Sequence, residues 1–220
     1  MDQTPKHATD IKAPPVREAR GESRRQQVLD AAAICFRRNG FRGASMSEIS
    51  ALAGMSTGHI YHYFKNKEAI VEAIIKRDLQ EGMTFMESLK EADDIVQMLV
   101  DGAKDCIVDR NKLSEPALTL EILAEASRNP AISAIMDDCE TSIRRSFIEA
   151  LETGRKRGVI APDARIEVAC TMMMLIFDGI TVQSAVNPLF DHEVILKELE
   201  RLLNQALRPG VGSDLNHPKP

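Results

Sequence analysis

Residues 45–67, with the sequence SMSEISALAGMSTGHIYHYFKNK, constrain the fold of this chain more than any other stretch. Ser45 and Glu48 have the spacing of a capping box, in which two side chains satisfy free backbone N–H groups where a helix begins. Gly54 can adopt the left-handed backbone conformation that ends a helix, and Ser56 can cap a second helix directly after it. Two short helices joined by a tight, glycine-containing turn are typical of a helix-turn-helix, so we predict this motif here.

The second helix of this motif carries side chains suited to binding DNA. Ile60 and Phe64 are four residues apart and are expected to face inward, which leaves polar and aromatic groups outside. Hydroxyl and imidazole groups form hydrogen bonds with base edges, and tyrosine rings pack on thymine methyl groups. Lysine, histidine and tyrosine side chains donate hydrogen bonds to phosphates. A glycine near the helix start lets the backbone approach DNA closely. The candidate DNA contacts are Ser45, Thr57, Gly58, His59, Tyr61, His62, Tyr63, Lys65 and Lys67.

Charge is distributed unevenly along the chain, which has a formal net charge of −5. Residues 1–67 carry 11 lysines and arginines against 6 acidic residues, whereas residues 68–220 carry 17 against 27. Electrostatic fields decay over about 8–10 Å at physiological salt, so an acidic body does not prevent a basic end from binding phosphates. The pattern predicts a basic DNA-binding module attached to an acidic domain.

Apolar residues recur every three or four positions between the two ends of the chain, and no alternating, strand-like segment interrupts them. We therefore predict an all-α fold of about nine helices, with a three-helix helix-turn-helix domain at 21–67 and an effector-binding and dimerisation domain at 68–207. The segments 1–20 and 208–220 are rich in proline or glycine, which predicts a disordered arm and a flexible tail. Basic side chains of the arm either contact the minor groove of DNA or stay solvated.

Other classes of protein fit the sequence less well. No apolar run approaches the about 20 residues of a membrane-spanning helix, so we expect a soluble, cytoplasmic protein without a membrane partner. The four cysteines lie far apart and are expected to be buried hydrophobic residues, with redox sensing as the alternative. His59 and His62 have no third metal ligand near them in the sequence, and no catalytic triad order or phosphate-binding glycine loop is present. We expect no catalytic residue, metal or cofactor; an all-α enzyme or an interaction module without DNA binding is the alternative.

From about residue 25 to residue 75 the chain resembles the N-terminal DNA-binding domain of the TetR family of transcriptional regulators. The resemblance lies in RRNGFRGASM and then EISALAGMSTGHIYHYFKNKEAI, and it is most specific in the letters YHYFKNKE. Ser50 stands where relatives often have alanine, and serine is small enough to pack there. His59 occupies a variable contact position and is expected to tune the operator sequence. Residues 154–160 and Asp178 lie in segments that resemble the family's C-terminal domain more weakly.

The resemblance implies a homodimer in which the last two helices of each chain form a four-helix interface, and an effector pocket enclosed by the fourth to seventh helices. A small-molecule effector would shift the fourth helix and move the two recognition helices apart, so that the dimer no longer spans major grooves about 34–36 Å apart. Residues 165–186 are also too apolar for the surface of a monomer, and Leu199, Leu202 and Leu203 add an apolar stripe. The implied function is that of a ligand-released repressor of a (pseudo)palindromic operator.

Acidic residues on otherwise apolar helices give the best indication of what the effector is. Glu121 and Glu125 lie one helical turn apart in LTLEILAEA, and Asp178 lies in LIFDGI. A carboxylate in an apolar pocket attracts a lipophilic cation, which suits the regulator of an efflux gene. The same acids equally serve as caps, interhelical hydrogen-bond acceptors or solvent-facing groups. The candidate effector-binding residues are Glu121, Glu125, Phe147, Met174, Phe177 and Asp178.

Overall fold

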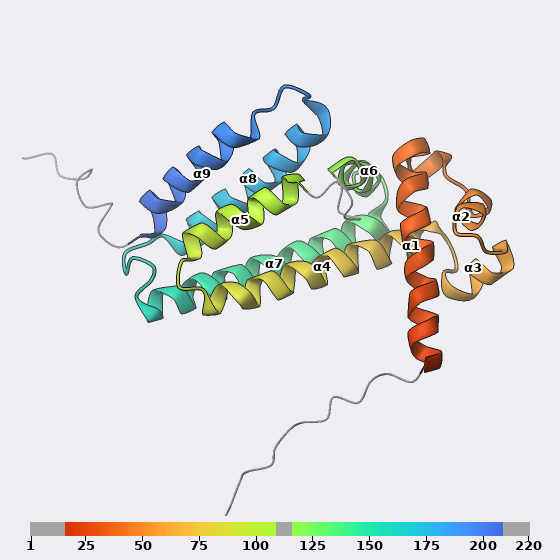
Figure 1. Ribbon diagram of the computed structural model, residues 1–220, viewed down its shortest axis with the longest axis horizontal. Helices are drawn as coiled ribbons and strands as arrows, with labels where there is room; N and C mark the ends of the chain where they lie inside the picture. Colours follow the sequence, from red (N-terminus) through yellow and green to blue (C-terminus); the bar gives the residue numbers. More distant parts are fainter. Residues whose placement is uncertain (1–15, 109–115, 209–220) are drawn as a thin grey trace, which may run out of the picture.

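Nine α-helices and no strand make up residues 16–108 and 116–208, the part of the chain that the computed structural model describes (Figure 1). They are α1 (Val16–Gly43), α2 (Met46–Leu52), α3 (Thr57–Tyr63), α4 (Lys67–Glu91), α5 (Ile95–Val108), α6 (Pro116–Ala126), α7 (Pro130–Arg157), α8 (Ile166–Val186) and α9 (His192–Leu207). The predicted all-α class is thereby confirmed. Helices α1 to α3 form one end of the molecule, α4 and α7 run side by side, and α8 and α9 contact α5.

Local signals begin and end the two short helices where the sequence predicts. The Ser45 Oγ accepts from the Glu48 N–H at 3.1 Å and the Glu48 carboxylate accepts from the Ser45 N–H at 2.8 Å, so the capping box is confirmed. Gly54 has a φ of 61°, the left-handed conformation that its role requires. Ser56 caps α3 by accepting from the His59 N–H. The helix-turn-helix is therefore specified by residues close together in the sequence.

Helix α1 is longer than expected and is interrupted near its end. It begins at Val16, inside the segment expected to be disordered, because the arginine, glutamate and alanine residues there favour helix without needing an apolar face. The interruption lies at Gly40, whose φ of 68° and ψ of 166° are not helical. The rest of the expected arm (1–15) and most of the expected tail (209–220) lie outside the described residues.

Two groups of buried side chains divide the molecule, and α4 runs through both. The first lies mainly between α1, α2, α3, α6 and the start of α4, and it includes Phe36, Ile49 and Ile60. The second lies between the end of α4 and α5, α7, α8 and α9, and it includes Leu99 and Leu151. One continuous helix therefore belongs to both cores.

Helix α8 is long and apolar enough, by length and composition alone, to cross a membrane, even though its sequence holds no long uninterrupted apolar run. In this fold it packs against α5, α6 and α7, and 22% of its most apolar window is buried within the chain. Val168, Met172 and Leu175 lie on its outer side and are 44%, 52% and 60% exposed. These side chains form an apolar face that the single chain leaves uncovered.

Candidate DNA interface and effector cavity

Helix α1 holds the helix-turn-helix in place from behind. The Gln27 amide donates to the Ala53 carbonyl at 2.8 Å, where α2 ends. The Arg25 guanidinium lies 4.9 Å from the centre of the Phe64 ring, where α3 ends. Ile60 and Phe64 are buried, as their four-residue spacing predicts. These contacts fix one face of α3 and leave the opposite face to solvent.

The solvent-facing side of α3 carries the aromatic residues selected from the sequence. His59, Tyr61 and His62 are exposed, and Tyr63 is partly buried. The centre of the Tyr63 ring lies 5.3 Å from that of His59 and 5.7 Å from that of His62. Contacts among these rings reduce the side-chain freedom that binding would otherwise remove. The face is therefore partly ordered before any partner arrives.

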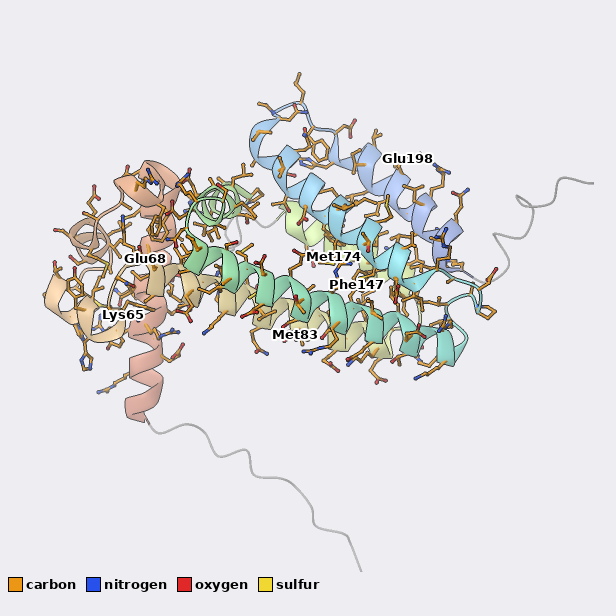
Figure 2. All side chains as sticks on the ribbon, turned by 180° about the vertical axis from the view of Figure 1, so that it is seen from behind. Lys65, Glu68, Met83, Phe147, Met174 and Glu198 are labelled. Carbon is orange, nitrogen blue, oxygen red and sulfur yellow. The ribbon has the colours of Figure 1, made fainter. Side chains whose placement is uncertain are left out.

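Gly58 and Lys65 also face solvent at this end of the molecule. A Cβ added to Gly58 would meet no protein atom within 4 Å, so nothing inside the described chain requires glycine there. Lys65 is exposed directly after α3, and Figure 2 shows it beside the helix-turn-helix. An open glycine and an exposed lysine suit the close approach of a phosphate backbone.

Two of the expected DNA contacts already bond within the motif through their hydroxyl groups. The Ser45 Oγ lies 2.9 Å from the Glu48 carboxylate, within the capping box. The Thr57 Oγ1 lies 2.9 Å from the Oγ of Ser50, which in turn donates to the Ser47 carbonyl at 2.8 Å. Serine at position 50 therefore does more than fill the small space that alanine would fill.

The structure places Lys67 differently from the expected phosphate contact. Its Nζ donates to the carbonyls of Phe41 at 2.6 Å and Ala44 at 2.8 Å, and it lies 4.7 Å from the centre of the Phe41 ring. These carbonyls lie just past the break at Gly40, where α1 ends and its backbone acceptors lack helical N–H partners. The Lys67 ammonium group thus joins the start of α4 to the end of α1.

A cavity of about 410 Å³ lies between α4, α5, α7 and α8 in the second core. Phe147, Met174, Phe177 and Asp178, four of the six expected effector residues, line it. Figure 2 shows Phe147 and Met174 beside each other between α7 and α8. Phe147 is buried at the apolar floor, whereas Asp178 is exposed at the rim.

The lining of this cavity is acidic and aromatic. Four carboxylates and three phenylalanine rings line it, and none of the described lining residues is a lysine, arginine or histidine. The carboxylates belong to Asp78, Glu81, Asp105 and Asp178, and the rings to Phe85, Phe147 and Phe177. The Arg77 guanidinium lies 2.6 Å from Asp78 and 3.9 Å from Glu81 and offsets part of this negative charge, so the cavity attracts positive charge mainly at Asp105 and Asp178, beside π-faces and apolar surface.

Burial makes two of these carboxylates more costly to ionise than usual. It raises the pKa of Asp78, although the Arg77 guanidinium, 2.6 Å away, acts in the opposite direction. Asp178 is exposed overall, but desolvation of its carboxylate beside the cavity wall raises its pKa, and the nearby Glu140 carboxylate raises it further. A cation bound beside Asp178 would favour its ionised form, whereas Asp78 already has the Arg77 guanidinium as its counter-ion.

Glu121 and Glu125 do not line this cavity, which corrects their selection as effector residues. Helix α6 packs on α1 and turns them toward the first core. The Glu121 carboxylate accepts from the Phe41 N–H at 3.4 Å, and the buried Glu125 pairs with Arg128 at 2.6 Å. Both residues therefore have a structural role, as hydrogen-bond acceptor and ion-pair partner. The sequence does not distinguish this role from effector binding, because an acidic residue on an apolar helix gives the same pattern whichever core it faces.

Sequence reasoning missed Asp78, Glu81 and Asp105, which supply three of the four cavity carboxylates. On α4, Asp78, Glu81 and Phe85 share one face because they are three and four positions apart. That spacing was the available signal, but an ordinary solvated helix face has the same pattern. Only the packing of α5, α7 and α8 against this face shows that it borders a cavity.

The cysteines and histidines add no further site in the described chain. Cys35 and Cys170 are buried and Cys139 is partly buried, and burial raises the pKa of all three thiols. A raised pKa keeps a thiol protonated and unreactive, which favours the expected hydrophobic role over redox sensing. The side chain of Cys106 lies outside the described residues. No group of three or more metal-binding side chains occurs among those that are described.

An exposed helix-turn-helix at one end and a ligand-sized cavity in a separate helical core define a ligand-responsive, DNA-binding transcriptional regulator. The family model for "Bacterial regulatory proteins, tetR family" matches residues 28–74, and the model for "BetI-type transcriptional repressor, C-terminal" matches residues 105–208. The chain belongs to the TetR family of bacterial transcriptional regulators. This places it with regulators rather than with enzymes.

Relatives and solved structures support this membership over most of the chain. The transcriptional regulator UidR of Escherichia coli is 30% identical over 152 residues, which cover 69% of this chain and 76% of UidR. Salmonella enterica GusR has a TM-score of 0.71 and 29% identity, covering 84% of this chain and 95% of GusR. A regulator from Saccharomonospora viridis in complex with choline shares the fold, with a TM-score of 0.70, 19% identity and coverage of 85% and 98%.

Proposed function

We propose that this chain represses transcription in the cytoplasm by binding a (pseudo)palindromic operator as a homodimer, and that a lipophilic organic cation releases it. The observation that carries the effector proposal is the cavity lining of four carboxylates and three phenylalanine rings without a basic residue. Its volume of about 410 Å³ falls within the range of small-molecule sites. The Saccharomonospora viridis regulator, which has the same fold, was crystallised with choline, which is itself an organic cation.

The arrangement of polar and apolar groups supports a cation with a hydrophobic body. Exposed Glu81, Asp105 and Asp178 lie at the rim, where they attract positive charge from solvent. The aromatic rings beneath them contribute about 0.5–2 kcal/mol each to a cation held over their faces. Met86 and Met174 add flexible apolar surface that adapts to ligands of different shape. Such tolerance suits the control of an efflux gene, which we propose as the regulated function.

The uncovered face of α8 and α9 supports dimerisation through the last two helices. Val168, Met172 and Leu175 on α8 and Leu202 on α9 are at least 44% exposed. A groove between the two helices, bounded by Met172 and Leu202, continues this surface. Monomers rarely expose contiguous apolar surface of this kind, and a second copy covers it with closed two-fold symmetry.

Helix α4 supplies the connection between cavity and DNA. Its 25 residues extend for about 37 Å, and the cavity residues Asp78, Glu81 and Phe85 lie about 16–27 Å along it from Lys67, which bonds to the α1 carbonyls. A cation drawn between the rim carboxylates shifts this helix and, with it, the helix-turn-helix of each chain. Release requires that the cation bind the DNA-incompetent arrangement more tightly than the DNA-bound one.

Fluorescence anisotropy tests operator binding and release together. The duplex upstream of the protein's own gene is titrated beside a scrambled duplex of equal length at two salt concentrations. We expect tight binding to the first duplex only, weakening with salt because phosphate contacts release counterions. Rhodamine 6G, a permanent lipophilic cation, should then release the duplex, whereas the anionic dye fluorescein should not. Equal effects of the two dyes would contradict a cation-selective cavity.

A matched pair of charge-neutralising variants locates the effector site. Asp178→Gln and Glu198→Gln each remove one exposed carboxylate, but only Asp178 lines the cavity, whereas Glu198 lies on α9 (Figure 2). We expect rhodamine 6G affinity to fall about ten-fold in Asp178→Gln and to stay unchanged in Glu198→Gln, because only the first loses an ion pair with the ligand. Equal affinities in the two variants would remove Asp178 from the site.

A further inference from the structure

A hydrogen-bond chain between α2 and α3 fixes the direction of two protons. The Ser50 Oγ lies 2.8 Å from the Ser47 carbonyl oxygen and 2.9 Å from the Thr57 Oγ1. A carbonyl oxygen has no proton, so the single hydroxyl proton of Ser50 must lie on the bond to Ser47. The second contact then holds a proton only if Thr57 donates to Ser50. The reverse arrangement would leave the two oxygens of the first contact 2.8 Å apart with no proton between them.

Burial protects this arrangement from exchange with solvent. Ser50 is 4% exposed, and it lies on the inner side of α2 against the first core. Water therefore does not replace Thr57 as the donor to the Ser50 Oγ. Hydrogen bonds in such a chain also polarise one another, which strengthens each of them.

The fixed proton decides what Thr57 offers to a partner outside the protein. Thr57 is the first residue of α3 and is partly exposed. Its hydroxyl proton is used internally, so its side chain presents oxygen lone pairs and a methyl group but no donor. Phosphate oxygens accept protons only, and so do both major-groove groups of guanine. Adenine and cytosine each present an amino group, which donates.

We infer that Ser50 restricts the Thr57 hydroxyl to accepting hydrogen bonds from operator bases. Thr57 then binds the amino group of adenine or cytosine and disfavours guanine. Thr57 is then a base contact and not a phosphate contact, and Ser50 is a positioning residue for sequence specificity. This inference rests on the proposed binding of operator DNA by α3. An alanine at position 50 would leave the Thr57 proton free to donate, and the preference against guanine would be lost.

Selection from a random duplex pool, with the full-length chain, tests the inference without a known operator. The base that Thr57 reads is the one that the wild-type protein enriches and Thr57→Val does not, and we expect it to be adenine or cytosine. Every base pair holds one of these two bases, so substitution of that base is the decisive step. In anisotropy measurements on duplexes differing only at that base, guanine should weaken wild-type binding about ten-fold, the effect of one hydrogen bond. In Ser50→Ala the penalty should shrink to about three-fold or less. Thr57→Val, which has the same shape without the hydroxyl, should lose the preference for an amino group altogether.

Ser47→Ala is the matched control, because it makes the same chemical change on the same helix and keeps the Ser47 carbonyl that accepts from Ser50. It should leave base preference unchanged.

Identical base preferences in Ser50→Ala and wild type would overturn the inference. So would a Thr57→Val variant that weakens all sequences equally, because that result identifies a phosphate contact. A wild-type selection without any enriched sequence would overturn operator binding as well. Thermal unfolding checks the fold of each variant, and if Ser50→Ala does not fold, Thr57→Val still tests whether Thr57 reads an amino group.

Discussion

The DNA-binding end and the cavity of this molecule differ in how far apart in sequence their working residues lie. In the helix-turn-helix, the capping box and the Ser50–Thr57 contact join residues three and seven positions apart. The cavity instead takes Asp78 from α4 and Asp178 from α8, about 100 positions along the chain. A locally determined face follows from the sequence residue by residue, whereas a cavity between distant helices depends on how those helices pack.

The largest expected effect tests whether the two regions are energetically separate. Ile60→Ala empties a fully buried position in the first core and should lower the free energy of unfolding by about 3 kcal/mol. Operator binding should weaken with it, because α3 loses the side chain that holds its inner face. Rhodamine 6G affinity should stay unchanged, since Ile60 belongs to the first core and the cavity to the second. Denaturant unfolding and dye titration measure the two effects, and a parallel loss of dye affinity would show that the cores are not independent.

The same separation explains which parts of the molecule could be predicted from sequence. The all-α class, the capping box, the turn at Gly54 and the exposed face of α3 follow from local rules on caps, glycine and helical spacing. Lys67, selected as a phosphate contact, has backbone carbonyls at the end of α1 as its partners, and no side-chain pattern in the sequence reveals such partners. Glu121 was misjudged because periodicity places an acid on a helix face but does not say which core that face meets.

Gly58→Ala is expected to have a smaller effect, in which stability and operator affinity change in opposite directions. Gly58→Ala adds a methyl group into open space, and alanine favours helix over glycine, so the free energy of unfolding should rise by about 0.5 kcal/mol. The same methyl group should obstruct the approach of DNA to the backbone and weaken operator binding about ten-fold, or about 1.4 kcal/mol. Thermal unfolding and anisotropy measure the two quantities. Unchanged operator affinity would mean that the backbone at Gly58 does not approach DNA.

The cavity is expected to respond to pH through Asp178. The pKa of Asp178 is raised by burial and Glu140, so cation affinity should be complete at high pH and fall as the pH drops through that raised value. The loss should begin above about 3.9, the ordinary pKa of aspartate, and reach several-fold. Protonation of Asp178 itself favours folding, because its folded form binds the proton more tightly than the unfolded form, whereas Glu72 and Asp94, whose pKa values are lowered, act in the opposite direction. Thermal unfolding at each pH therefore separates a loss of affinity from unfolding. Rhodamine 6G keeps its charge throughout, and a smaller loss of affinity in Asp178→Asn than in the wild type would assign that part of the titration to this residue, since the pKa of Asp78 is raised as well.

The smallest expected effect concerns Glu121, where the two regions meet. The Phe41 N–H donates to the Glu121 carboxylate at 3.4 Å, while the Phe41 carbonyl accepts from Lys67 at 2.6 Å, so α6 and α4 hold neighbouring peptide groups at the end of α1. Glu121→Gln keeps an acceptor oxygen and weakens only a long hydrogen bond, so unfolding should change by less than about 0.5 kcal/mol. Rhodamine 6G affinity should equal that of Glu198→Gln, because neither residue lines the cavity.

Release from DNA is the quantity that should move in Glu121→Gln. If the junction at Phe41 carries the displacement of α4 to the helix-turn-helix, the dye concentration that releases half of the operator should shift about two-fold, while the dye dissociation constant stays constant. Coupling between two sites is a free-energy difference of its own, so it changes independently of either affinity. A fall in dye affinity itself would instead place Glu121 at the effector and contradict the cavity between α4, α5, α7 and α8. Comparing release with affinity in this one variant therefore separates a residue that contacts the ligand from one that transmits its binding.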